Sequence, residues 1–211
     1  MSDSSRAGLE SHSTQRLSLL FELSRASSAL IELDELLRFV NARTKEVLGA
    51  ESCAILLLDE TSEELFFPVS SDLSPEVESR FKEIRFPADK GLAGWVLQHG
   101  TPTIIPDVTQ DDRFYPDVDR QSGAQTRDLL YAPLRTRHGV LGVIGLRNKL
   151  IGRFDEEDLA FLDALAGSIA IAIENARLYA QVKASEERLH TLVRRDRSRT
   201  IPRVSRLAPL P

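Results

Sequence analysis

One helical pattern in the C-terminal part of the chain, from Phe154 to about Val193, constrains the fold most, because it carries two different apolar stripes in succession. The first stripe has the three- and four-residue spacing that puts side chains on one helix face, so a sheet or a core has to cover it. The second stripe has the 4-3-4-3 spacing of a seam against another helix. The first stripe consists of Leu159, Leu162, Leu165, Ala166, Ile169 and Ile173, and the second of Leu178, Val182, Leu189 and Leu192, with Ser185 between them.

The length of this pattern indicates two different surroundings for one helix. At about 1.5 Å per residue it would reach roughly 60 Å, well beyond a domain of this size. We therefore expect the early turns to close a folded domain and the later turns to leave it as an output rod that meets a second subunit. An amphipathic helix near the N-terminus is expected to join this rod in a parallel bundle. The predicted dimer interface consists of Leu17, Leu20, Leu23, Leu178, Val182, Leu189 and Leu192.

The composition limits the class of protein. With 211 residues, of which 42% are hydrophobic and 28% are charged, the chain suits one well-cored domain with helical extensions. The polar N-terminus lacks a signal peptide's apolar core, and no run approaches the roughly 20 consecutive apolar residues of a membrane span, so we expect a cytoplasmic protein without membrane contact. The net charge of -5 argues against nucleic acid as the main ligand, because phosphate binding depends on concentrated Lys and Arg.

Short apolar runs separated by turn residues predict a sheet in the middle of the chain. Two pairs of neighbouring runs, each joined by a polar turn, are typical of hairpins. Hairpin-joined strands with helices gathered at both ends indicate an α+β fold, in which helices flank an antiparallel sheet of about six strands and long helices stand at both termini. We expect strands at 52–58, 65–69, 84–86, 103–105, 129–134 and 140–146, and helices over 34–48, 75–81 and 91–99.

The stretch from Asp107 to Thr126 is the longest one without clear periodicity. Long irregular segments inside compact domains are usually functional lids or disordered, and we interpret this one as a lid. Its aspartates suggest general acid or base chemistry, but no paired base, nucleophile elbow or phosphate loop accompanies them, so solvated carboxylates explain them better. The acidic residues are Asp111, Asp112, Asp117 and Asp119, and they surround Phe114, Tyr115 and Pro116.

Taken together, several segments resemble the GAF domain, a small-molecule sensing fold found in bacterial kinases, phosphodiesterases, cyclases and transcription activators. The resemblance covers roughly Leu30 to Val182 and is specific for the fold, whereas none of the segments is specific for a ligand. The segments that carry it are Lys90–Val96 (KGLAGWV), Thr103–Val108 (TIIPDV), Leu129–Leu134 (LLYAPL), Val140–Leu146 (VLGVIGL), Phe154–Leu159 (FDEEDL) and Ala172–Tyr179 (AIENARLY).

The resemblance implies a division of the chain and a place for a pocket. We expect a disordered N-terminus over 1–14, a dimerisation helix over 15–33, a GAF domain over 34–177, a signalling helix over 178–195 and a disordered basic tail over 196–211. In GAF-like proteins the pocket lies between the sheet and the loops that follow the third and fourth strands. Here this implies Phe86, Trp95, Asp107, Phe114, Arg120 and Tyr131 as ligand-binding residues.

The resemblance leaves the ligand unidentified. Cyclic-nucleotide-binding GAF domains carry an Asn-Lys pair, followed by a Phe and, three residues after that Phe, by Asp-Glu. This chain has Asn148, Lys149 and Phe154, but its Asp155 and Glu156 follow Phe154 immediately. The motif is therefore incomplete. Cyclic nucleotide therefore stays an open option. A covalent bilin and a haem are disfavoured, because Cys53 lies in a predicted strand and the histidines next to Gly100 and Gly139 fall at turns. No metal cluster is expected.

Two functional hypotheses remain. The first is a sensory module that binds an unidentified small molecule, forms a homodimer and passes occupancy of the pocket through its terminal helices to a signalling protein, as in a two-component system. The second is a degenerate, ligand-free GAF domain that serves as a dimerisation or docking scaffold. We do not expect an enzyme, because the single Cys53 cannot supply the resolving thiol that the GAF-fold methionine sulfoxide reductases need.

Overall fold

The computed structural model describes Arg16, Ser18 and residues 33–199 of the chain. From residue 33 onward the order of elements agrees with the prediction, apart from a 3-10 turn and a short helix inside the segment predicted to be irregular. The elements are α2 (Leu33–Val47), β1 (Ala50–Asp59), β2 (Glu64–Asp72), α3 (Pro75–Phe81), β3 (Arg85–Pro87), α4 (Gly91–His99), β4 (Thr103–Ile105), η1 (Val108–Gln110), α5 (Asp117–Ser122), β5 (Leu129–Thr136), β6 (Gly139–Lys149) and α6 (Glu156–Arg199).

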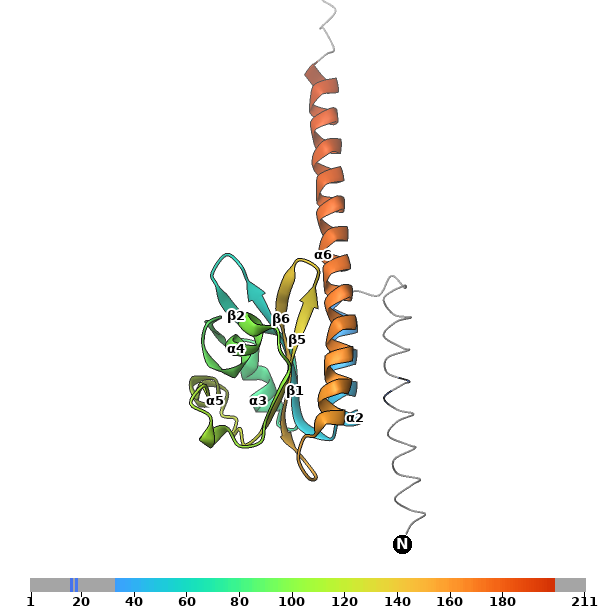
Figure 1. Ribbon diagram of the computed structural model, residues 1–211. Coiled ribbons are helices and arrows are strands. Elements are labelled where there is room, and N and C mark those ends of the chain that lie inside the picture. Colours follow the sequence, from blue (N-terminus) through green and yellow to red (C-terminus); the bar gives the residue numbers. More distant parts are fainter. Residues whose placement is uncertain (1–15, 17, 19–32, 200–211) are drawn as a thin grey trace, which may run out of the picture. The chain divides into compact units, whose positions relative to one another are not determined.

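The six strands form one antiparallel sheet in the order β3-β2-β1-β6-β5-β4, which confirms the predicted α+β fold with an antiparallel sheet of about six strands. The long terminal helices of that prediction are not confirmed by it. Helix α2 and the early turns of α6 cover one face of this sheet, and α3, α4 and α5 lie on the other (Figure 1). The two hairpins predicted from apolar runs are β1–β2 and β5–β6. The long central strands β1 and β6 pair with each other, so residues almost a hundred positions apart lie side by side.

Strand β1 shows why the sheet is buried on both faces. Its side chains alternate, so Cys53, Ile55 and Leu57 pack against α2 and α6, while Ala54 and Leu56 belong to the cluster with α3 and α4. A strand covered on both faces reads as a continuous apolar run rather than as an alternating one. This explains the unbroken apolar sequence of the first predicted strand.

The first apolar stripe of α6 covers the sheet, as its spacing predicts. Leu162, Leu165 and Ile169 are fully buried in the larger core cluster, which they share with α2, β1, β5 and β6. The helix begins with a reciprocal cap, in which the Asp158 backbone N–H donates to the Asp155 carboxylate at 2.9 Å. By length and composition alone the segment Glu156–Tyr179 could cross a membrane, but Leu162, Leu165 and Ile169 within it belong to this core.

The chain divides into two compact units between Ile173 and Glu174, within α6. In the second unit, Leu178 and Val182 have exposed fractions of 48% and 57%. The remaining residues of the predicted dimer interface, namely Leu17, Leu20, Leu23 and the side chains of Leu189 and Leu192, lie outside the described residues. The same holds for 1–14 and 200–211 of the ends predicted to be disordered, whereas residues 196–199 of the predicted basic tail are part of α6. The dimer interface therefore stays a prediction.

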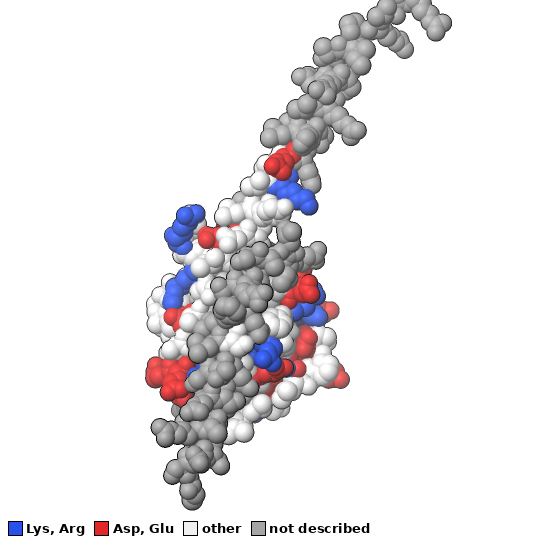
Figure 2. Space-filling view, turned by 90° about the vertical axis from the view of Figure 1, so that its right-hand side faces the viewer, with Lys and Arg blue, Asp and Glu red and all other residues white. Residues whose placement is uncertain are grey.

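Charged side chains of both signs are interspersed over the described surface that Figure 2 shows. Elsewhere in the described chain, charged side chains form ion pairs: Nη2 of Arg135 donates to both carboxylate oxygens of Asp163, at 2.6 and 2.7 Å. Mixed charges of this kind largely cancel at a distance. The visible described face therefore offers no broad field of one sign.

Candidate functional site

Small side chains on the central strands leave a hollow on the sheet face that carries α3, α4 and α5. Ser52 of β1 pairs with Arg147 of β6 on one side and with Asp72 of β2 on the other, while Ala54 pairs with Gly145. Residues that face each other across antiparallel strands point to the same side of the sheet. The floor is therefore a polar row beside a row of small residues. Above it lies a hollow that is partly open to solvent.

The ring of Tyr131 lies directly over Gly145 on this floor. A Cβ at position 145 would stand 2.1 Å from the ring atom Cε1, so only glycine admits the ring in this place. Burial raises the pKa of the Tyr131 phenol far above its ordinary value, and the nearby Asp119 carboxylate raises it further. The phenol therefore stays protonated at neutral pH and presents a neutral hydroxyl on the floor.

A row of aromatic rings forms one wall of the hollow. The centroids of Phe67 and Phe81 are 5.0 Å apart, those of Phe67 and Phe86 are 6.1 Å apart, and those of Phe86 and Tyr115 are 6.0 Å apart. These separations are typical of packed aromatic pairs. The row joins β2, α3 and β3 to the segment 107–126. The hollow is further lined by Leu56, Gly91, Leu92, Ala93, Phe114, Val118, Asp119, Thr126, Leu129 and Leu146.

The segment 107–126, predicted to be a lid, is held in place by its own hydrogen bonds. The Asp119 carboxylate accepts from the backbone N–H and the hydroxyl of Thr126, both at 2.7 Å. The Asp111 carboxylate accepts two bonds from the Arg113 guanidinium, which also lowers the pKa of Asp111. These bonds let an irregular segment serve as an ordered wall of the hollow, and its function as a lid stays a prediction.

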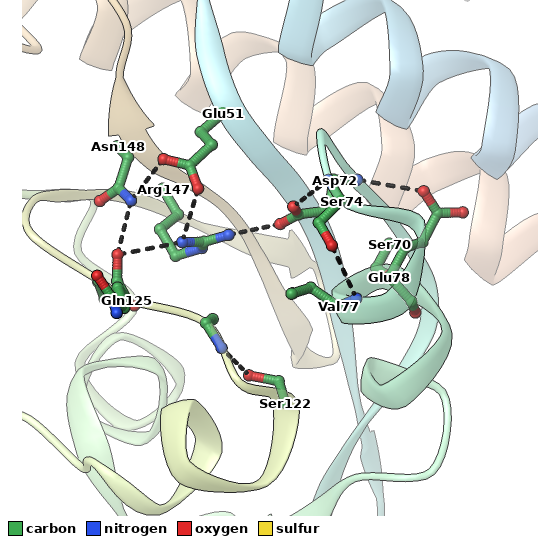
Figure 3. Close-up of polar contacts among 12 residues, drawn as sticks. Glu51, Ser70, Asp72, Ser74, Val77, Glu78, Ser122, Gln125, Arg147 and Asn148 are labelled. Atoms are coloured by element: carbon green, nitrogen blue, oxygen red, sulfur yellow. Dashed lines mark hydrogen bonds and ion pairs between the residues drawn. The ribbon is translucent and has the colours of Figure 1, made fainter.

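Arg147 is the buried cation of the floor, with an exposed fraction of 6%. Its Nη2 donates to Asp72, and its Nη1 donates to Glu51 at 3.3 Å and to the Gln125 carbonyl at 3.2 Å (Figure 3). The remaining donor, Nε, is buried and has no hydrogen-bond partner among the described residues. A buried polar group without a partner is unusual in native proteins and calls for an explanation.

The next two residues of β6 extend this network in two directions. Asn148 has φ +59, and its side-chain amide donates to Glu51 and to the Gln125 carbonyl, both at 2.8 Å (Figure 3). Lys149 forms an ion pair with Asp158 in the first turn of α6 at 2.6 Å. Three consecutive residues therefore connect the floor of the hollow, the end of the segment 107–126 and the start of α6.

Three of the six predicted ligand-binding residues line the hollow. Phe86 and Tyr131 contribute to its wall and floor, and Phe114 reaches it from the segment 107–126. Phe114 also lines a surface groove next to the hollow, together with Lys90 and Trp95. The structure thus brings these three predicted residues together, and their contact with a ligand stays a prediction.

The other three predicted residues lie outside the hollow. Trp95 is on a different side of α4, where its ring stacks on His99 with centroids 4.4 Å apart and the Arg113 guanidinium lies 4.5 Å above it. Asp107 caps the turn η1 by accepting two bonds from Thr109, which lower the pKa of its carboxyl. Arg120 is exposed and pairs with Asp117 of the same helix.

Sequence reasoning missed the polar groups of the floor. Arg147 directly follows the apolar run 140–146, and this interruption of a central strand was the signal that could have identified it. Asp119 was interpreted as one of several solvated carboxylates. Asp158, the partner of Lys149, stands four positions after Phe154, whereas the acidic residues weighed for the cyclic-nucleotide motif were Asp155 and Glu156.

Neither cysteine chemistry nor a metal site is part of the hollow. Cys53 is fully buried on the opposite face of the sheet, between β1 and the helices α2 and α6, and burial raises the pKa of its thiol strongly. The described residues hold no group of three or more His, Cys, Asp or Glu side chains arranged to bind a metal ion. The residues that line the hollow offer apolar contacts, hydrogen-bonding groups and the charged side chains of Arg147 and Asp119.

Comparison with known proteins gives a consistent picture. A family profile described as GAF domain matches residues 31–174. The chain is 28% identical over 165 residues to a probable 3',5'-cyclic phosphodiesterase of Caenorhabditis elegans, which covers 75% of the chain and 23% of that protein. It is 30% identical over 155 residues to a dual 3',5'-cyclic-AMP and -GMP phosphodiesterase 11A of Takifugu rubripes, which covers 70% of the chain and 17% of that protein.

The fold is also similar to solved structures. The GAF domain of a phosphoenolpyruvate-protein phosphotransferase from Coxiella burnetii superimposes with a TM-score of 0.68 at 22% identity, covering 80% of this chain and 98% of that one. The two similarities differ in extent: this chain spans less than a quarter of each of the two phosphodiesterases but almost the whole of the solved domain. What these proteins share with the chain is therefore one domain.

Proposed function

We propose that this chain, which belongs to the GAF domain family, is a sensory or regulatory module whose hollow binds a small organic molecule. GAF domains are small-molecule sensing domains and occur in phosphodiesterases and phytochromes. The observation that carries the proposal is the hollow itself, where apolar and aromatic walls surround a few oriented polar groups, above all Arg147 with its unpartnered Nε. Ligand sites in proteins have this composition.

The signal would travel along the end of β6. A ligand that touches Arg147 acts on a side chain whose partner Gln125 belongs to the segment 107–126, and Asn148 holds the same carbonyl. Lys149, which follows Asn148, forms an ion pair with Asp158 of α6. Occupancy of the hollow would thus shift the balance between two arrangements of the segment and of the helix start.

The output is proposed to be a homodimer that docks to or controls a signalling protein in the cytoplasm, as in a two-component system. Exposed Leu178 and Val182 support this, because their spacing suits a helix seam. Light scattering on a chain shortened to end at Arg177 should report weaker association than the full chain. An unchanged dimer would remove the rod from the interface.

The ligand is proposed to be bound rather than converted. Cyclic AMP and cyclic GMP are the first compounds to test, since the relatives named above are cyclic-nucleotide phosphodiesterases. A covalent bilin is disfavoured because Cys53 lies on the other face of the sheet. The chain spans only part of those enzymes, so their catalytic activity is not carried over to it.

The decisive experiment combines two measurements on the full chain. Native mass spectrometry should detect a small molecule that copurifies with the protein, and thermal unfolding should shift upward when that molecule or a cyclic nucleotide is added. A ligand at 100 times its Kd stabilises the folded state by about 2.7 kcal/mol. No bound compound and no shift with any compound would favour the ligand-free scaffold instead.

A further inference from the structure

The unpartnered Nε of Arg147 specifies what the floor of the hollow can recognise. The guanidinium is an obligatory donor, because it carries five N–H groups and no acceptor. The side chain is almost fully buried and lines the hollow, and only this one of its nitrogens lacks an acceptor. An acceptor atom of a ligand would complete the set of hydrogen bonds, which lowers the free energy of a group that is otherwise buried without a partner.

The charges around Arg147 determine the kind of acceptor. Its two terminal nitrogens already donate to the carboxylates of Asp72 and Glu51, and a third carboxylate, that of Asp119, also lines the hollow. An anionic ligand atom at Nε would place another negative charge among these carboxylates in a poorly solvated site. A carbonyl oxygen or a ring nitrogen brings the acceptor without the charge.

The walls determine the shape of the group that carries this acceptor. On the floor the ring of Tyr131 covers Gly145, and the rings of Phe67, Phe86 and Tyr115 also line the hollow. A flat ring system fills such a space with the least ordering cost and stacks on or against the wall rings. A flexible chain would lose more conformational freedom for the same contacts.

We propose, on the basis of the function proposed above, that the floor of the hollow recognises the uncharged carbonyl edge of a flat ring compound, with Nε of Arg147 donating the hydrogen bond. A hydrogen bond from a charged donor of this kind corresponds to a difference of about ten- to a hundredfold in affinity. Arg147 is thereby the residue that discriminates between flat ligands with and without an uncharged acceptor.

Three flat bicyclic probes test this directly by calorimetry and thermal unfolding of the full chain. Isocarbostyril is an uncharged lactam with a carbonyl acceptor, indole has a donor but no acceptor, and naphthoate carries an anionic carboxylate. We expect isocarbostyril to bind at least about tenfold more tightly than either of the others. Equal binding of the three probes, preference for naphthoate or no binding of isocarbostyril at millimolar concentration would overturn the inference.

A pair of matched variants assigns the preference to Nε. Arg147→Lys keeps the positive charge but loses Nε, and it should reduce the preference for isocarbostyril to near unity. Arg127→Lys is the control, because Arg127 also pairs with Glu51, at 3.7 Å, but has a side chain that is 62% exposed and does not line the hollow. If Arg147→Lys fails to fold, the ratio of the three probes on the unaltered chain decides.

The outcome is separable from that of the proposed function. A protein that copurifies with a small molecule and is stabilised by it, but shows no preference for isocarbostyril over indole, remains a sensor and refutes the recognition by Arg147. A preference that persists unchanged in a folded Arg147→Lys variant refutes it as well. A preference that disappears there, but not in Arg127→Lys, supports it.

Discussion

Adding a single methyl group at Gly145 tests how the hollow is built. In Gly145→Ala the new Cβ would lie 2.1 Å from Cε1 and 2.4 Å from Cδ1 of Tyr131, whereas ordinary contact begins at 3.4 Å. The ring therefore has to retreat by roughly 1 Å or more, against neighbours that are themselves packed. Overpacking of this kind costs about 1 to 3 kcal/mol in the free energy of unfolding. Strand propensity alone predicts the opposite sign, because glycine weakens a strand interior.

The same chemical change elsewhere in the chain serves as the control. Gly167 lies in α6, and a Cβ built there meets no atom within 4 Å. Alanine is favoured over glycine in a helix by about 1 kcal/mol, so Gly167→Ala should stabilise the protein. Urea unfolding followed by circular dichroism measures both changes, and we expect their free energies of unfolding to differ by about 2 to 4 kcal/mol.

A double-mutant cycle shows whether the Tyr131 ring is the cause. In a Tyr131→Leu background the ring atoms next to position 145 are absent, so Gly145→Ala should cost little there. The coupling between the two positions should then approach the full cost of the single change. If Gly145→Ala destabilises the protein equally in both backgrounds, or does not destabilise it at all, the ring does not set the size of the hollow and the reasoning is refuted.

Three further changes have defined outcomes. Lys149→Met leaves the buried Asp158 with one cation fewer and should destabilise the protein by about 3 kcal/mol or somewhat less, whereas Arg135→Met, which breaks an exposed ion pair, should cost less than about 1 kcal/mol. Urea unfolding compares the two variants, and equal costs would contradict the argument that burial strengthens the first ion pair. Tyr131 has a raised pKa, so its contribution to the free energy of unfolding is fully present below the ordinary value of 10.0 and is lost as pH rises above it. When unfolding is measured at increasing pH, Tyr131→Phe should therefore lose less stability at alkaline pH than the unaltered chain, and an identical loss would count against a buried phenol. Leu165→Ala creates a cavity between α6 and the sheet and should cost about 2 to 5 kcal/mol in thermal unfolding, while a cost below 1 kcal/mol would mean that α6 does not close this core.

Much of the fold was predictable because its signals are local. The spacing of Leu162, Leu165 and Ile169 identifies a helix face without any knowledge of what covers it, and the structure buries all three. The same holds for the hairpins, since a polar turn between two apolar runs defines both strands and their direction. Helix α5 was not predicted because six residues are too few for a periodic pattern.

The hollow could not be predicted in the same way because it depends on register. Ser52, Asp72 and Arg147 form one row only through the pairing of three strands, and the sequence separation between Ser52 and Arg147 hides that neighbourhood. The resemblance to GAF domains supplied the region of the pocket but not the side of α4 that faces it. Trp95 was therefore grouped with Phe86, although it lies against His99 and Arg113 instead.

The two faces of the sheet differ in that the residues of one face line the hollow, and this difference locates the site. The face under α2 and α6 is filled by fully buried residues such as Leu130, Leu134 and Ile144, as expected of a core that serves stability alone. On the face under α3, α4 and α5, Gly145 admits the ring of Tyr131, and Arg147 is buried with an unused donor. Departures from close packing and full hydrogen bonding concentrate at functional sites. The face under α2 and α6 also buries polar atoms without partners, namely Asn41 Oδ1 and Ser71 Oγ, so an unused donor alone does not locate the site. The reason for placing recognition over the floor is that Arg147 also lines the hollow.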